Sequence, residues 1–206
     1  MAANMPLRRP GNHRPKLRVG LGLAVALLFG ACSVQPVAAP VDDTAFWHHL
    51  QVNALEADPP TSVAELVGRA DVIVTGRVRG VETGPSAGPT QGPATPLVAL
   101  VVRADSVIKG ELTSQDVKIV VAPFSPVDTV LQTKPAGNQA IFFLKPATQP
   151  GYYSCVSQWG LVEDTPDGLV TVVEPVQSAL VNAGQGATPK TFAEFVDEVG
   201  VLVRAG

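Results

Sequence analysis

Six stretches of the chain show the alternation or the branched and aromatic composition typical of β-strands. In 71–82, Val72, Val74 and Val78 share one face, and Gly76 between them marks a bend of the kind that curls a sheet. Only turns separate the six stretches, which favours an antiparallel sheet over β-α-β units. We therefore expect a mainly β fold, a curled antiparallel sheet or a barrel of about five to six strands with short flanking helices. The predicted strands lie within 71–82, 96–110, 117–122, 139–145, 152–159 and 168–174.

Helix signals flank these strands on both sides. Asp42 and Asp43 can cap a short helix that a pair of prolines ends, and Ser62 with Glu65 forms the S-x-x-E pattern of a capping box. Apolar residues at helical spacing follow Thr191, and we expect this last helix to pack across one open end of the sheet. The three predicted helices cover 44–57, 63–69 and 191–203.

The amino-terminal region has the pattern of an export signal. Five basic residues and no acid occur among the first eighteen residues, and the uncharged run 19–31 is too short to span a bilayer as a helix. The run ends in Gly30, Ala31 and Cys32, which resembles the lipobox of bacterial lipoproteins, although Phe29 stands where that motif usually has Leu. The resemblance implies cleavage after Ala31 and attachment of a diacylglyceryl group to the sulfur of Cys32.

The amino-terminal region also fits other routes of export and processing. The segment VAAP offers small residues for ordinary signal cleavage near Ala38 or Ala39, and an uncleaved anchor is a further alternative. Arg8 and Arg9 suggest twin-arginine export, but Pro10 follows where apolar residues would be expected, so general secretion is favoured.

Cleavage before Cys32 would leave one domain of ordinary size with an acidic balance. The segments are then a signal peptide over 1–31, a tether with a short helix over 32–60, and a single β-rich domain over 61–206 with a carboxyl-terminal helix. The mature chain would carry ten Lys or Arg against eighteen Asp or Glu, a net charge of −8. This charge disfavours nucleic acid as a partner, so the predicted membrane association at the outer face of the cell membrane depends on the lipid anchor.

The search for catalytic and metal-binding residues predicts no cofactor and no metal ion. The pattern G-x-S-x-G occurs at 84–88, but it lies in a Gly-Pro loop and no histidine follows His49 in the chain. His48 and His49 are adjacent, so they lack the i, i+4 spacing that favours a metal on a helix. The acidic run 163–167 contains Pro-Asp-Gly and predicts a hairpin turn rather than a calcium site.

Cys155 and the aromatic residues around it are the remaining candidates. Lipidation of Cys32 would leave Cys155 without a disulfide partner, and its apolar surroundings predict a core thiol. Tyr152, Tyr153 and Trp159 could line a ligand pocket or an interface, or else belong to the core.

The order of these elements resembles known folds over about residues 62–175. The features are ADVIVTGRV with its strand glycine, the ending IKG and the run G-x-x-A-I-F-F-L, which are similar to the five-stranded oligonucleotide/oligosaccharide-binding (OB) type of barrel and to the netrin-like domains. The netrin-like group includes metalloproteinase inhibitors that use an amino-terminal cysteine, for which only Cys32 is available here. The lipobox and the Ala, Val, Gly and Pro-rich composition also look like lipoproteins of high-GC Gram-positive (actinobacterial) bacteria.

Three function classes follow from these observations. The favoured class is a membrane-anchored extracytoplasmic lipoprotein that acts as a binding or interaction module for a protein or small-molecule ligand, with no catalytic residues. The alternatives are an envelope enzyme whose site no motif reveals and a protease-inhibitor-like domain.

Overall fold

The computed structural model describes residues 39–50, 58–86, 96–157, 160–171 and 191–206. The fold is mainly β, with seven strands and four helices in this part of the chain, which confirms the predicted class. The strands are β1 (Val72–Thr83), β2 (Val98–Lys109), β3 (Asp116–Val121), β4 (Gln139–Pro146), β5 (Tyr152–Cys155), β6 (Leu161–Thr165) and β7 (Gly168–Thr171). The helices are α1 (Thr44–His48), α2 (Val63–Arg69), α3 (Val127–Gln132) and α4 (Phe192–Ala205).

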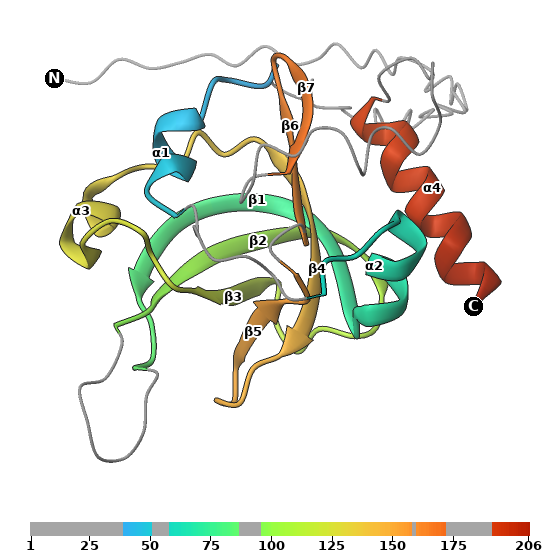
Figure 1. Cartoon of the computed structure of the whole chain (residues 1–206), viewed down its shortest axis with the longest axis horizontal. Helices are drawn as coiled ribbons and strands as arrows, with labels where there is room; N and C mark the ends of the chain where they lie inside the picture. Colours follow the sequence, from blue (N-terminus) through green and yellow to red (C-terminus); the bar gives the residue numbers. More distant parts are fainter. Residues whose placement is uncertain (1–38, 51–57, 87–95, 158–159, 172–190) are drawn as a thin grey trace, which may run out of the picture. The chain divides into compact units, whose positions relative to one another are not determined.

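Five of the strands close into a ring. β1 pairs with β2, β2 with β3, β3 with β5, β5 with β4, and β4 with β1 (Figure 1). β6 pairs with β4 on the edge opposite β1, next to β5, and forms a hairpin with β7. All of these pairings are antiparallel except that of β3 with β5, which is parallel. The sheet is therefore mixed and curled into a barrel, not antiparallel throughout, because α3 and β4 lie between β3 and β5 and return the chain in the same direction.

Irregularities between β1 and β2 produce much of the curl. The register shifts between Ile73 and Val74, between Thr75 and Gly76, and between Val78 and Gly80. A side chain at Gly76 would place its Cβ 2.4 Å from the carbonyl oxygen of Arg103 on β2. Glycine therefore lets the two strands approach at this bend, as the sequence predicts.

The sheet buries apolar side chains on both of its faces. The inner face forms the barrel core around Val74, Leu100 and Phe142, and this core includes Phe46 of α1 and Val130 of α3. The outer face of β1, β4 and β6 carries a second apolar cluster that α2 and α4 cover. The second cluster comprises Val63, Leu66, Val67, Ala70, Ile73, Ile141, Phe143, Val162, Phe195 and Val199.

Helix α4 does not lie across an open end of the sheet, as we expected from the sequence. It packs beside α2 on the outer face, where Phe195 and Val199 contact the second cluster (Figure 1). The reason is that Ile73, Ile141 and Phe143 point outward from their strands and require a cover. The start of α4 agrees with the prediction, because Thr191 and Glu194 form a complete capping box.

Helix α2 has the predicted bounds and a modified cap. The hydroxyl of Ser62 accepts a hydrogen bond from the backbone N–H of Glu65 at 3.2 Å, as in a capping box. The Glu65 carboxylate, however, accepts from the backbone N–H of Thr61 at 2.8 Å, one residue before the N-cap. It also forms an ion pair with Arg69 one turn later, so local polar contacts stabilise both the first and the last turn of the helix.

The predicted turn over the acidic run 163–167 needs a correction of its bounds. The run 163–167 is not only a turn, since Glu163 and Asp164 belong to strand β6 and the turn itself lies at Pro166 and Asp167. The sequence did not predict this strand because acidic side chains are uncommon in strands.

Helix α3 was not predicted either, because six residues provide too short an apolar pattern for sequence analysis.

Helix α1 closes one end of the barrel, and its N-cap is used in an unexpected way. Asp42 accepts bonds from Thr44, at 3.0 Å from the backbone N–H and 2.7 Å from the hydroxyl, but Asp43 makes no capping bond within the helix. The Asp43 carboxylate instead accepts from the backbone N–H of Ala136 at 2.9 Å. The segment that the sequence assigns to the tether therefore contributes Phe46, Trp47 and Leu50 to the barrel core.

Candidate functional site

A groove at one end of β3 contains both tyrosines of the chain. Its volume is about 480 Å³, and it lies between the β2–β3 loop, the start of β3 and the turn that joins β4 to β5. We call it the tyrosine groove. It is lined by Thr113, Ser114, Lys118, Gln149, Tyr152 and Tyr153, together with Leu112, Asp116, Val117, Pro146, Ala147, Pro150 and Gly151.

The two tyrosines occupy different positions in this groove because successive strand residues point to opposite faces. Tyr153 packs against the barrel core, so its ring also has a structural role. Tyr152 lies on the other face, where the ammonium of Lys118 is 5.9 Å from the centre of its ring. The structure thus brings two of the three predicted contact residues into one groove, whereas Trp159 lies outside the described residues.

The positive charge beside Tyr152 is locally balanced. The ammonium of Lys118 lies 2.6 Å from a carboxylate oxygen of Glu82 on β1, and this hydrogen bond raises the pKa of the lysine. Asp116 also lines the groove, and the Arg103 guanidinium lies 3.4 Å from its carboxylate. The groove therefore offers an aromatic ring and polar groups with no strong excess of either charge.

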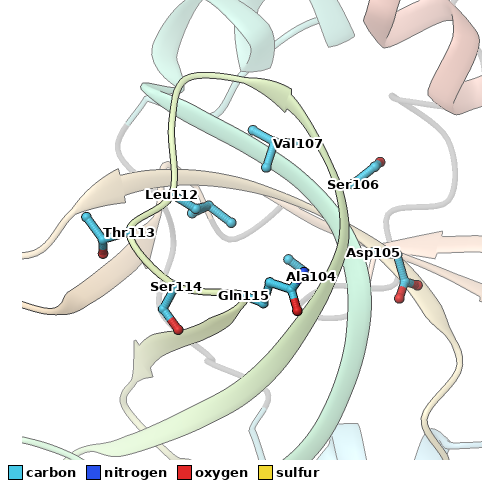
Figure 2. A pocket seen from close by; sticks show the side chains of 8 residues that line it. All are labelled: Ala104, Asp105, Ser106, Val107, Leu112, Thr113, Ser114 and Gln115. Carbon is cyan, nitrogen blue, oxygen red and sulfur yellow. The ribbon is translucent and has the colours of Figure 1, made fainter.

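A second hollow of about 400 Å³ adjoins the tyrosine groove. Figure 2 shows it between the end of β2 and the loop that leads into β3, with Val107 and Leu112 near its centre and Asp105 at its edge. The two hollows share the residues Leu112, Thr113 and Ser114. This short loop therefore forms part of the wall of both hollows.

A third, smaller cavity contains the described cysteine. It measures about 190 Å³ and is lined mainly by apolar side chains of the barrel, including Trp47, Leu100 and Leu161. Cys155 contributes to its wall and is half-buried, packed against the edge of the barrel core rather than within it. Burial raises the pKa of the Cys155 thiol to about 12, so the thiol is protonated at neutral pH and is a poor nucleophile.

A polar cluster around the buried Glu163 of β6 links this strand to α1 and to Asn138, the residue before β4. Glu163 is only 2% exposed, and its Oε2 accepts a hydrogen bond of 2.7 Å from Nε1 of Trp47. Burial and, to a lesser extent, the nearby negative charge of Asp43 raise the pKa of Glu163, hydrogen bonds with Trp47 and Asn138 lower it, and the net value is about 8. Burial also raises the pKa of Asp43. No local sequence signal could identify this cluster, because its members come from distant segments.

His48 and His49 lie in different surroundings. His48 is exposed, and Nδ1 of His49 lies 2.9 Å from the hydroxyl of Ser125. Within the described residues, no group of three or more His, Cys, Asp or Glu side chains is arranged to hold a metal ion. The lipidation and cleavage residues, Cys32 and Ala31, lie outside the residues that the structure describes.

Comparison with other proteins adds no family assignment. The chain matches no protein-family model and no curated protein sequence. Among the described residues, no helix has the length and apolar character needed to cross a bilayer. Inferences about function therefore rest on the residues of this chain.

Proposed function

We propose that this chain is an exported lipoprotein, anchored by acylated Cys32 after cleavage at Ala31, whose barrel acts as a binding module. The anchor is supported by the cationic leader, the short apolar run and the small residues before Cys32. The binding role is supported by a rigid ring of strands that carries the tyrosine groove at one end.

The observation that carries the binding role is the position of Tyr152. Its ring lies on the outer face of the barrel, in a groove with the hydroxyls of Thr113 and Ser114 and the amide of Gln149. An aromatic face beside neutral hydrogen-bonding groups suits a ligand that has a flat face and hydroxyl groups, such as a sugar ring. The charges of Lys118 and Glu82 compensate each other, which favours a neutral ligand over a strongly charged one.

A binding experiment with defined probes tests this proposal. We expect the detergent-purified full chain to bind members of a panel of neutral oligosaccharides. Tyr152→Ala should weaken that binding about tenfold, because the aromatic contact is lost. Tyr152→Phe keeps the ring and should retain most of it. Phe124→Ala removes an exposed aromatic side chain outside the groove and should have no effect.

Two outcomes would contradict the proposal. The first is binding that Tyr152→Ala leaves unchanged while the protein stays folded. The second is no binding to any oligosaccharide of the panel, which would remove this ligand class. The protonated thiol of Cys155 disfavours the alternative of a thiol-dependent envelope enzyme.

A further inference from the structure

The segment that precedes the barrel is fixed to it by specific hydrogen bonds. The backbone of Val41 makes two bonds with the side chain of Asn138: its N–H donates to Oδ1 at 2.8 Å, and its carbonyl accepts from Nδ2 at 2.6 Å. The bonds from Ala136 to Asp43 and from Trp47 to Glu163 follow in the next six residues. The chain is therefore docked on the barrel from Val41 onward and does not act as free tether there.

Little chain remains between this docked segment and the proposed anchor. Only six residues, 33–38, separate Cys32 from Ala39. Because an extended chain spans at most about 3.3–3.6 Å per residue, Cys32 and Ala39 cannot be more than about 25 Å apart. This limit is shorter than the thickness of the hydrocarbon layer of a membrane, so an acylated Cys32 would hold the α1 end of the barrel close to the lipid headgroups.

Two large apolar side chains are exposed on segments next to α1: Val41 in the chain before the helix, and Phe124 in the loop that is bonded to His49 after it. Val41 is 57% exposed and Phe124 is 58% exposed. The backbone N–H groups of Phe124 and Ser125 donate to the carbonyl of His49, at 3.0 Å and 3.2 Å, which places the Phe124 loop directly beside the docked segment. Isolated exposed apolar residues need no explanation, but these two flank the segment that leads to the anchor.

The loop that carries Phe124 is suited to an apolar environment. It runs from Ala122 to Pro126, and two of its five residues are prolines, which have no backbone N–H. Phe124 and Ser125 already donate to His49. Four of the five residues therefore have no free backbone donor, which lowers the cost of entering the membrane interface.

We infer that the α1 end of the barrel rests on the membrane, with Val41 and Phe124 at the boundary between headgroups and acyl chains. This inference rests on the lipid anchor proposed above. The exposed charges near these segments, Asp42, Asp128 and Lys134, give no positive excess that would attract anionic lipids, so we expect the contact to be apolar and to persist in high salt.

The inferred orientation also presents the tyrosine groove away from the membrane. The groove lies where β3 begins, near Asp116 and Val117, and the Phe124 loop follows the other end of the same strand at Val121. Figure 1 shows the chain passing from β3 to α3 through this loop. A ligand in the medium could therefore reach the groove.

Fluorescence quenching in vesicles tests this orientation. In a Cys155→Ser background, single variants Phe124→Cys and Val41→Cys are labelled with an environment-sensitive fluorophore. The full-length lipoprotein is then placed in vesicles of phosphatidylcholine and phosphatidylglycerol that contain a headgroup-labelled nitroxide lipid. Val107→Cys on β2 and Val201→Cys on α4 are matched controls, because both are also exposed apolar positions.

We expect a blue shift and several-fold stronger quenching at positions 41 and 124 than at positions 107 and 201, with no loss of either signal in high salt. Equal quenching at all four positions, or none at 41 and 124, would overturn the inferred orientation. Intact mass and vesicle flotation of the same samples separate the two proposals. Acylated, vesicle-bound protein without quenching at 124 contradicts only the orientation, whereas protein without acyl groups that stays in the aqueous phase contradicts the anchor as well.

Discussion

Trp47 and Glu163, which are 116 residues apart, meet through a buried hydrogen bond of 2.7 Å from the indole nitrogen to the carboxylate. Trp47 lies on α1 and Glu163 on β6, so the bond joins the segment before the barrel to the β6–β7 hairpin that follows the five strands of the ring. The indole ring also packs edge to face with Phe46 of the same helix, with ring centroids 4.8 Å apart. The docking of α1 should therefore depend on this pair.

We predict that the effects of Trp47→Phe and of a substitution at Glu163 on the free energy of unfolding are not additive. The variant removes the N–H donor as well as part of a buried ring, so the free energy of unfolding should fall by roughly 2–4 kcal/mol. In a double-mutant cycle with Glu163→Leu, measured by urea denaturation, the coupling energy should be about 1–2 kcal/mol. Costs that add without any coupling would show that the bond does not hold α1 in place.

Stability should depend on pH through the buried carboxyl groups. The pKa of Glu163 rises from an ordinary value of 4.5 to about 8 in the folded chain, and those of Asp43 and Asp164 are raised as well. Between pH 4.5 and about pH 8, Glu163 of the folded chain retains a proton that the unfolded chain has lost, so raising the pH favours unfolding. We expect the free energy of unfolding to decline from about pH 5 to about pH 8, by several kcal/mol at most.

The variant Glu163→Gln isolates the main source of this pH dependence. Glutamine keeps an oxygen that can accept from Trp47 but cannot ionise. Urea denaturation across the same pH range should therefore give a much flatter profile for the variant. An unchanged slope would mean that other groups, and not Glu163, cause the decline in the free energy of unfolding over this pH range.

Two glycines of β1 provide a matched pair for the barrel geometry. A Cβ at Gly76 would lie 2.4 Å from the backbone oxygen of Arg103, whereas a Cβ at Gly80 would have no heavy atom within 4 Å. Gly76→Ala should therefore lower the free energy of unfolding by about 2 kcal/mol or more, and Gly80→Ala should change it by less than about 0.5 kcal/mol. Thermal denaturation of both variants checks this difference, and similar melting temperatures would contradict the close approach of β1 and β2.

Cys155 should be protected from alkylation in the folded chain. Its pKa of about 12, against an ordinary value of 9.0, means roughly 1,000-fold less thiolate at neutral pH. Iodoacetamide labelling followed by peptide mass mapping should show slow modification at position 155 in buffer and rapid modification in urea. A Phe124→Cys variant in the Cys155→Ser background provides an exposed thiol for comparison, and equally fast labelling at both positions would refute the burial of Cys155.

The sequence predicted elements well where local patterns are strong. Alternating valines identified β1, and side-chain caps located the starts of α2 and α4. These signals depend on neighbours within a few residues, so they can be recognised in a single chain.

Features that depend on distant segments could not be predicted in the same way. The parallel pairing of β3 with β5 and the contact between Trp47 and Glu163 arise only when the ring closes. Lys109 illustrates the same limit: a cationic strand end commonly lies in water, but its ammonium donates to the carbonyl of Val67 at 2.8 Å near the end of α2. Of the candidate ligand residues, Tyr152 was identified from its residue type, whereas the groove around it comes from two separate turns.

The intact mass of the protein extracted from membranes of the producing cells is the most direct test of the proposed anchored binding module. We predict a chain that begins at Cys32 and carries the added mass of a diacylglyceryl group, and we predict that Cys32→Ser abolishes both the acyl mass and membrane retention. A water-soluble polypeptide that still carries residues 1–31 would contradict the lipid anchor and, with it, the inferred orientation at the membrane.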